Sequence, residues 1–565
     1  MVKKLFSILG SEIGNLHQAA YLLALFALFS QVLGLVGDRI LAFMFGAGHT
    51  LDLFYSAFRI PDLIYATIAS TVSASVLIPF LIEHFNKGDK EGKEFIDSVF
   101  TVFFGAMVVV SIVAYILAPW LVRTFLPGFG NDADFGQLVS AMRIMLFSPF
   151  FLGLSNFFSG VTQMNRRFLI YSLSPSLYNI GIIIGAVFFY RWLGLVGLIW
   201  GVALGACLHM AIQIPFIIRT HAFPRFVKVK KIDWPIIRRV VLLSAPRTLT
   251  LSANQLASFF LIALATFMAS GSIAVFNFAS AIESVPLTLI GVSYSSAAFP
   301  TLSKLFYSGK IEEFIREVAI SARHIIFWSL PVTALFIVLR AQIVRVVLGA
   351  GAFDWNATRL TAAALALFII SIVGQGLILL FVRAYYSQGL TRKPLIVNIF
   401  SAVLIAGLGY FLDKMYYAHT FFQYFIQGLL KVVDQPGVGV LMLPLAFSIG
   451  AIVNTLLHWY IFERDFPGFT RRLGDAFFQS LSAAVIGGYA AFLGLRFFNI
   501  FFPLTTTFNV FMQGFLAGLV GIAVCIGIFL LMKNPEIREV WRTLHEKFWK
   551  TKVVVPGPED SVLPS

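Results

Sequence analysis

Residues 507–532 read TFNVFMQGFLAGLVGIAVCIGIFLLM, a run without a single charged side chain. A helix that crosses the hydrocarbon core of a bilayer needs about 20 predominantly apolar residues. Long apolar runs of this kind recur along the chain, whereas a membrane barrel would show short segments of alternating polarity. The sequence therefore predicts an all-α polytopic membrane protein.

The composition excludes a water-soluble globule. Of 565 residues, 59% are hydrophobic and only 12% are charged, with a mean hydropathy of +0.86. A soluble protein carries roughly 25% charged residues. The two cysteines, Cys207 and Cys525, both lie in apolar runs, so neither a disulfide framework nor a cysteine metal cluster is expected. No phosphate-binding glycine loop and no hydrolytic motif stands out, so the chain is predicted to be no enzyme and to have no cofactor.

About fourteen spanning segments are predicted from the apolar runs. Several of them contain proline, which bends a membrane helix and is tolerated inside a bundle. The expected segments are approximately 21–46, 51–84, 95–126, 137–164, 168–190, 193–218, 241–268, 272–302, 319–348, 358–386, 394–413, 438–462, 476–500 and 507–532.

The basic residues alternate from loop to loop in the way that a cytoplasmic N-terminus requires. They cluster in the even-numbered loops and in the tail, at residues 87–93, 166–167, 219–239, 304–316, 392–393, 464–472 and 533–552. Cytoplasmic loops carry an excess of Lys and Arg. The pattern predicts an inner-membrane protein with both termini in the cytoplasm. It also explains the net charge of +15 without nucleic-acid binding, so no nucleic-acid partner is expected.

The chain repeats itself at an offset of 221 to 222 residues. Residues 79–88, PFLIEHFNKG, share the spacing of Pro, Leu, Phe and Gly with residues 300–309, PTLSKLFYSG, and LVRTFL at 121–126 matches IVRVVL at 343–348. Two lobes of six helices related by pseudo-two-fold symmetry are expected, at 1–220 and 221–465, because an even helix count gives both the same orientation. Two additional helices follow at 466–532.

The tail at 533–565 is predicted to begin with an amphipathic helix. Apolar residues recur there at helical spacing between basic ones. Such a helix either lies in the membrane interface or caps the bundle as a soluble element. The residues on its apolar face are Ile537, Val540, Trp541, Leu544 and Phe548.

Ionisable residues at membrane depth are the candidate functional groups. Each costs about 2.5–3.5 kcal/mol on insertion scales, so it faces a cavity or a partner. Arg59 and Arg247 lie in the first helices of the two lobes. Arginine presents a fork that matches phosphate oxygens, so a cationic cavity for a diphosphate is one reading, and internal ion pairs are the other. Arg59 and Asp62 are one turn apart and are expected to be able to pair. Asn254 and Gln255, near Arg247, are candidates to bind a sugar or peptide, or to bond between helices.

Several short motifs resemble the MurJ/MviN family of lipid II flippases. The resemblance runs through about residues 20–465 and is carried by Phe45-Gly-Ala-Gly48, Asp52-Leu-Phe54, Ala57-Phe-Arg59-Ile-Pro61, Ala269-Ser-Gly-Ser272 and Pro300-Thr-Leu-Ser303. It implies a fourteen-helix fold with two lobes around a V-shaped cavity. It further implies that the chain flips lipid II, the undecaprenyl-diphosphate-linked glycan, from the cytoplasmic to the periplasmic leaflet.

The family's arginines are partly replaced in this chain. The positions that match them hold Gln31, Gly37, Tyr65 and Ala281, whereas Asp52 is retained and Arg59 matches a basic position. Arg39, Arg59 and Arg247 are the candidates to replace the missing arginines in a rearranged site, with Asp52, Asn254 and Gln255 beside them. The expected partners are lipid II, membrane lipids and cell-wall synthesis proteins.

Other functions stay open from the residues alone. One alternative is a flippase for another polyprenyl-diphosphate-linked oligosaccharide. A cation-coupled drug antiporter would need a cavity dominated by carboxylates, which the excess of arginine disfavours. A non-transporting membrane scaffold would leave the repeat unused. A coupling cation is compatible with each transport function, but its identity is open.

Overall fold

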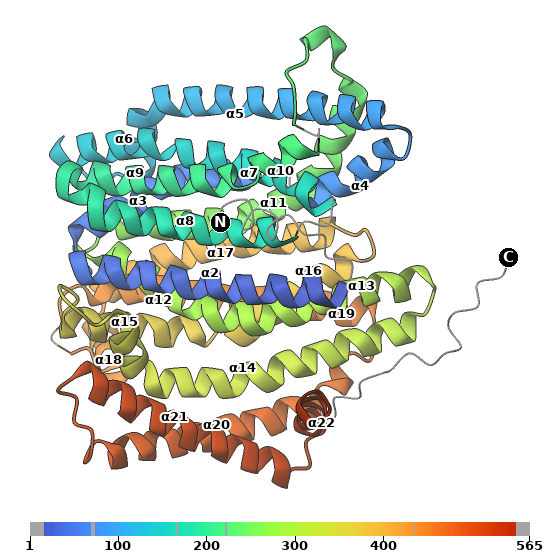
Figure 1. Cartoon of the computed structure of the whole chain (residues 1–565). Helices are drawn as coiled ribbons and strands as arrows, with labels where there is room; N and C mark the ends of the chain where they lie inside the picture. The colour runs from blue at the N-terminus through green and yellow to red at the C-terminus, as the bar shows by residue number, and fades with distance from the viewer. Residues whose placement is uncertain are drawn as a thin grey trace.

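The computed structural model describes residues 16–68, 74–130, 132–164, 168–220, 223–433 and 435–549. The side chains of 16–24, 74–76, 79, 168, 231, 243, 246–247, 250–254 and 543–549 are not described. Every regular element in these ranges is a helix (Figure 1). Up to Arg219 they are α2 Leu16–Phe45, α3 His49–Thr67, α4 Ala74–Phe85, α5 Asp89–Phe125, α6 Asp132–Met145, α7 Phe147–Met164, α8 Phe168–Ile184, η2 Gly185–Phe189, α9 Tyr190–Ala211 and α10 Ile214–Arg219.

The remaining elements follow a linker that contains the short η3 (Val229–Lys231). They are α11 Trp234–Ala265, α12 Ser272–Leu287, η4 Thr288–Val292, α13 Ser293–Tyr307, α14 Ile311–Leu348, α15 Trp355–Ile369, α16 Ile372–Tyr386, α17 Arg392–Ala418, α18 Thr420–Leu430, η5 Val438–Leu441, α19 Met442–Asp465, η6 Thr470–Arg472, α20 Gly474–Phe498, α21 Thr507–Leu531 and α22 Pro535–Trp549.

Ten stretches of the described chain are long and apolar enough to cross a membrane, and the bent pair α15 and α16 makes an eleventh. One of the ten, Leu169–Arg219, breaks its helical backbone at Gly194 and contains two of the expected crossings. The two expected segments that remain, 51–84 and 241–268, include residues or side chains outside the description. The helical membrane fold is confirmed, and the count is consistent with the fourteen crossings expected.

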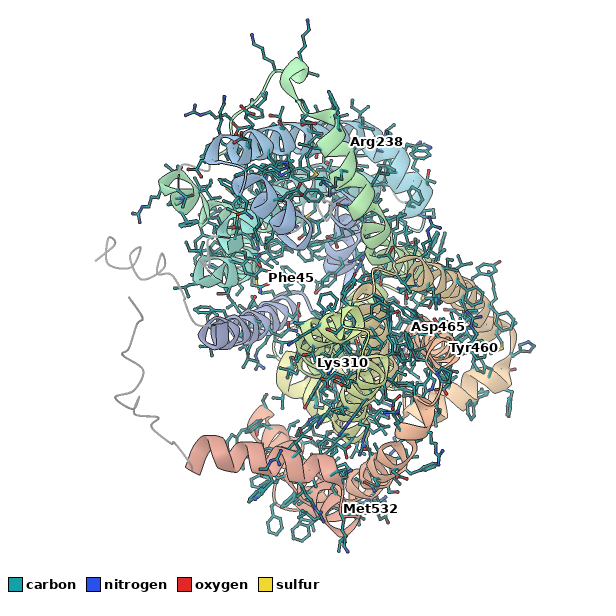
Figure 2. The ribbon with its side chains drawn as sticks, turned by 90° about the vertical axis from the view of Figure 1, so that its right-hand side faces the viewer. Phe45, Arg238, Lys310, Tyr460, Asp465 and Met532 are labelled. Atoms are coloured by element: carbon teal, nitrogen blue, oxygen red, sulfur yellow. The ribbon has the colours of Figure 1, made fainter. Side chains whose placement is uncertain are left out.

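The helices lie side by side along one direction and form two groups. In Figure 1 the blue-to-green helices from α2 to α10 lie mostly above the yellow and orange ones, and the red α20 and α21 lie at the bottom. Figure 2 looks along the helices and shows the same separation, with α20 to α22 on the outside of the second group. The division agrees with two lobes and an appended helix pair.

Small residues let neighbouring helices approach closely. A Cβ on Gly181 would lie 2.2 Å from the Gly205 Cα, and a Cβ on Gly185 would lie 2.6 Å from the Gly201 Cα. These pairs hold α8 and α9 together in antiparallel orientation. Such contacts replace the hydrophobic driving force, which is missing between helices in lipid.

The internal repeat has a structural counterpart. Gly88 and Gly309 both have positive φ angles, of 148° and 71°, and each closes the turn before a very long helix. Those helices, α5 and α14, have 37 and 38 residues, and each carries an arginine in its last turn, Arg123 and Arg345. Equivalent sequence segments therefore build equivalent corners in the two lobes.

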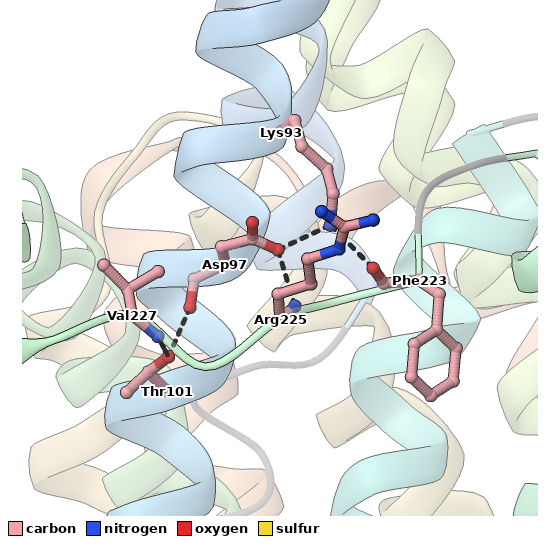
Figure 3. A network of polar contacts seen from close by, with 6 residues as sticks. All are labelled: Lys93, Asp97, Thr101, Phe223, Arg225 and Val227. Atoms are coloured by element: carbon pink, nitrogen blue, oxygen red, sulfur yellow. Dashed lines mark hydrogen bonds and ion pairs between the residues drawn. The ribbon is translucent and has the colours of Figure 1, made fainter.

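The linker between the lobes is fastened to α5. Figure 3 shows this linker strap, residues 223–227, running along the helix. Asp97 accepts hydrogen bonds from the Arg225 amide (2.8 Å) and from Lys93 Nζ (2.6 Å). Lys93 also donates to the Phe223 carbonyl (2.6 Å), and the Val227 amide donates to Thr101 Oγ1 (3.0 Å).

The start of α11 packs with the first lobe as well. Ile232 and Ile237 share a buried cluster with Phe80, Phe95 and Phe157. The far end of α11, by contrast, belongs to the core that joins both lobes. This helix therefore bridges the lobes, and relative motion between them must bend or tilt it.

Removing the Asp97 carboxylate should release the linker strap. We expect Asp97→Ala to raise the rate of trypsin cleavage at Arg225 and Lys228 on the order of fivefold. The reason is that loss of the Asp97 hydrogen bonds lowers the free energy of local opening by about 1 kcal/mol. Timed digestion followed by mass spectrometry measures the rate. Asp89→Ala is the control, since exposed Asp89 lies on the same helix and makes no hydrogen bond to the strap among the described residues. Equal cleavage of both variants would contradict the prediction.

The tail helix α22 is docked onto α14. Glu536 is buried and bound by Arg323 (2.6 Å), and Asn534 accepts the Ile537 amide (3.0 Å) at the start of the helix. Ile537 and Val540 pack against Phe327, Ala483 and Phe529, whereas Trp541 is exposed. The predicted helix is present, and two of its five apolar residues contact the bundle. The side chains of Leu544 and Phe548 lie outside the description.

Candidate functional site

The two lobes meet at a seam formed by three helix corners and by Gly128 in the loop between α5 and α6. These corners are residues 43–52 between α2 and α3, residues 266–274 between α11 and α12, and residues 346–352 between α14 and α15. The Ala352 amide donates to the Phe43 carbonyl (2.9 Å), and the Gly128 amide donates to Thr266 Oγ1 (3.1 Å). We call this set of contacts the lobe seam.

Asp52 joins α3 to the start of α12 at the lobe seam. Its buried carboxylate accepts hydrogen bonds from the backbone amides of Gly271 (2.5 Å) and Ala274 (2.9 Å). The first amides of a helix have no intrahelical partner and carry partial positive charge. A carboxylate from the other lobe satisfies two of them. The structure therefore places Asp52 in a clamp between the lobes.

Arg39 binds the opposite kind of helix end. Its guanidinium donates to the carbonyls of Val346 and, at 3.3 Å, Val347 in the last turn of α14. The last carbonyls of a helix are unpaired and partly negative, so a cation there is favourable. Arg39 of the first lobe thus caps a helix of the second lobe at the same seam.

Arg59 also crosses between the lobes, deeper along α3. Its Nη2 donates to Asn277 Oδ1 on α12, and its Nε is buried with no hydrogen-bond partner among the described residues. The expected pairing with Asp62 is limited to electrostatic interaction, since no ion pair between them occurs in the described part of the chain. Arg59 therefore keeps an unused donor at the junction of the lobes.

The other predicted site residues are only partly described. The side chains of Arg247 and Asn254 lie outside the described residues, and their backbone belongs to α11. Gln255 is exposed on the same helix. The structure thus brings Arg39, Asp52 and Arg59 together along α2 and α3, next to α12.

Sequence reasoning missed the partners of these residues on α12. Asn277 and Ser284 are polar residues of the mostly apolar α12, and Ser284 Oγ accepts from Gln31 Nε2 (3.3 Å). Tyr65 accepts from Asn156 Nδ2 (3.0 Å). Gln31 and Tyr65 stand where the family resemblance expects arginine, so neutral hydrogen bonds occupy two of those positions. The polar residues within the apolar run of α12 were the sequence signal that could have identified these partners.

Gly271 is the tightest backbone contact of the clamp. It has φ +90°, and a Cβ there would lie 2.1 Å from the Ala47 carbonyl oxygen. Both family motifs, Phe45–Gly48 and Ala269–Ser272, therefore meet at this point. Only glycine allows the two corners to approach so closely.

Gly271→Ala should destabilise the protein more than Gly309→Ala. Gly309 also has positive φ, but its added Cβ would meet nothing within 4 Å. The control therefore costs about 1–2 kcal/mol for the left-handed backbone, and Gly271→Ala adds overpacking, for roughly 2–5 kcal/mol in total. Thermal unfolding in detergent, followed by tryptophan fluorescence, compares the two. Equal melting temperatures would show that the lobe seam is not tightly packed there.

Comparison with known proteins identifies the family. The sequence profile described as lipid II flippase MurJ matches residues 41–512. The chain belongs to the lipid II flippase MurJ family. It is a multi-pass membrane transporter of that family, and the match runs from the end of α2 through α20 to the start of α21.

Individual relatives agree with this assignment. The lipid II flippase MurJ of Burkholderia cenocepacia is 27% identical over 449 residues, which cover 78% of this chain and 83% of the relative. A probable lipid II flippase MurJ of Buchnera aphidicola is 26% identical over 478 residues, which cover 82% and 86%.

Solved structures share the fold. A lipid II flippase MurJ in an inward closed conformation superposes with a TM-score of 0.71 at 22% identity, over 92% of this chain and 100% of that one. An inward-facing multidrug transporter of the MATE family reaches 0.62 at 15% identity, over 78% and 96%. At these identities the solved structures show that the fold is shared, and the family profile decides between the two transporter families.

Proposed function

We propose that this protein flips lipid II across the inner membrane by alternating access, with Arg59 binding the diphosphate of the head group. The observation that carries the proposal is the position of Arg59. It reaches from the first lobe to Asn277 of the second lobe, and its buried Nε has no hydrogen-bond partner among the described residues. A phosphate oxygen is a suitable acceptor for that donor, because arginine binds phosphate through several parallel hydrogen bonds.

The physical task explains why such a group lies between lobes. A diphosphate and its glycan cannot cross hydrocarbon unaided, whereas the polyprenyl tail can remain in it. When the lobes rock, a cationic group at their junction is presented first to one side and then to the other. Arg39 and Asp52 hold the lobe seam closed in one state. Arg247, Asn254 and Gln255 on α11 are proposed to complete the head-group site.

The orientation follows from the charge pattern. We infer that both termini and the linker strap face the cytoplasm, because the basic loops alternate as cytoplasmic loops do. The lobe seam then lies at the periplasmic end. Membrane lipids surround the bundle, and cell-wall synthesis proteins are the proposed protein partners.

Complementation tests the proposed function. Cells depleted of their own lipid II flippase should grow when this chain is expressed. A purified, reconstituted protein should also move a lipid II analogue with a labelled head group between leaflets. Good expression without rescue and without flipping would reject lipid II as the cargo. Movement of a different polyprenyl-diphosphate glycan in the same vesicles would then favour the alternative cargo.

A further inference from the structure

A buried carboxyl in the second lobe has no cationic partner in the described structure. Glu283 on α12 is only 4% exposed. Its Oε1 accepts a hydrogen bond from Gln375 Nε2 on α16 (2.7 Å), which is a neutral amide. Glu283 forms no ion pair in the described part of the chain. An ionised carboxylate at membrane depth without a cation would cost several kcal/mol, so the group must carry a bound cation or a proton.

Most of the described arginines on neighbouring elements are bound to groups other than Glu283. The elements packed against α12 are α2, α3, α11, α14, α15, α16, η4 and η5. The Arg247 side chain on α11 lies outside the described residues. The charged groups at the outer ends of these elements are His49 at the start of α3, Arg238 and Arg239 near the start of α11, and Glu312, Glu313, Arg316, Glu317, Arg323 and His324 in the first half of α14. The other described charged groups are Asp52 on Gly271 and Ala274, Arg39 on Val346 and Val347, Arg59 on Asn277 beside Asp62, Asp38 near Tyr55, Arg340 on Leu430, Arg345 on Phe353, Arg359 on Lys431 and Arg383 on Ser296.

The carboxyl lies next to a broken helix. The pair α15 and α16 bends by 44° at the break between them. There Ser371 Oγ donates to the Phe368 carbonyl (2.7 Å) and accepts from Gln375 (2.9 Å), and Ser448 Oγ donates to the Leu367 carbonyl (2.7 Å). Interrupted helices with freed carbonyls near the bilayer midplane are where secondary transporters bind coupling ions. The break is an observation independent of the burial of Glu283.

The same helix carries the contacts between the lobes. Asn277 binds Arg59, and Ser284, the residue after Glu283, binds Gln31 of the first lobe. Glu283 itself points to α16 of its own lobe. Loss of the proton would place an anion in this packed region, and α12 would have to shift to hydrate it. A shift of α12 moves both the Arg59 contact and the lobe seam.

We propose that Glu283 is a proton-carrying carboxyl that couples movement of the head group to a proton gradient. Glu283 is protonated in the conformation described here, with Gln375 donating to one oxygen and the proton on the other. When the lobes rock, the proton leaves to water on one side and is taken up again from the other. This inference rests on the proposed flippase activity, since it names what drives that cycle.

The experiment measures the steady-state distribution of a head-group-labelled lipid II analogue in proteoliposomes under an imposed gradient. One pH unit is worth about 1.4 kcal/mol per proton, so the ratio between leaflets should move about tenfold for the unaltered protein. Glu283→Gln, which keeps the shape of a protonated carboxyl, should still equilibrate the lipid but hold the ratio near one. Glu313→Gln, a change at an exposed residue that pairs with Lys310, is the control and should respond like the unaltered protein.

The outcomes separate the two proposals. If the unaltered protein moves no lipid, the proposed function fails. If it moves lipid and Glu283→Gln keeps the tenfold response, or if only a sodium gradient at equal pH shifts the ratio, the proton role of Glu283 is overturned. If Glu283→Gln does not fold, proton movement is measured with an entrapped pH dye in vesicles of the unaltered protein. Flipping without accompanying proton movement would also refute the proton role of Glu283.

Discussion

Arg59→Gln should reduce flipping of the lipid II analogue roughly 10- to 150-fold. A hydrogen bond to a charged group contributes about 1.5–3 kcal/mol, and its loss converts to that range. Gln cannot supply the charge or the fork of the guanidinium. Because the structure leaves the Arg59 Nε unpaired in the described part of the chain, the loss should fall on the cargo rather than on the fold.

The measurement is the initial rate of head-group transfer in proteoliposomes, with the melting temperature recorded beside it. Arg143→Gln is the matched control. Arg143 is also an arginine at membrane depth, but it donates to the Tyr115 carbonyl (3.2 Å) and stacks on the Tyr115 ring within the first lobe. A control that loses as much activity as Arg59→Gln, or an Arg59→Gln protein with unchanged rate, would discard Arg59 as the diphosphate ligand.

The fold was largely predictable because it depends on local properties of the sequence. An apolar run long enough to cross the bilayer must be helical, since lipid offers no partner for the backbone. The repeat at Pro79 and Pro300 also corresponds to equivalent structure in the two lobes, because α5 and α14 begin after equivalent glycines. Three expected crossings do not appear as separate long apolar helices. Leu169–Arg219 is helical on both sides of the break at Gly194, so two crossings form one stretch. The segment 51–84 carries Asp52, Arg59 and Asp62 in its first helix, and 241–268 includes side chains outside the description.

The site was predictable in its residue types and not in its contacts. Insertion cost alone marks Arg39, Asp52 and Arg59 as residues that need a partner. Which partner each finds depends on where helix ends of the other lobe lie. Arg39 finds carbonyls at the end of α14, and Asp52 finds amides at the start of α12, more than 200 residues away along the chain. No local sequence pattern encodes contacts between such distant residues. The sequence therefore does not distinguish an arginine that caps a helix from one that binds phosphate.

Asp52→Ala should lower the free energy of opening the lobe seam by about 3 kcal/mol. This shifts the equilibrium from the closed to the open form roughly 100-fold. The estimate follows from losing a buried carboxylate that accepts two amides, of Gly271 and Ala274, and that also caps a helix. With the clamp gone, the corners at 43–52 and 266–274 separate more often. Flipping should slow at least as much as in Arg59→Gln, because one half of the rocking cycle lacks its closed state.

Spin labels across the seam measure this opening directly. Labels at the exposed positions Asp132 and His419, one in each lobe and in a background without Cys207 and Cys525, should report one distance in the unaltered protein and a second, longer one in Asp52→Ala. Asp354→Ala is the control, since Asp354 caps α15 within its own lobe by accepting the Ala357 amide (2.7 Å). That variant loses a comparable cap but no contact between lobes, so its distance should stay single. A longer population in both variants would mean that the seam responds to general destabilisation, and the clamp assigned to Asp52 would be wrong.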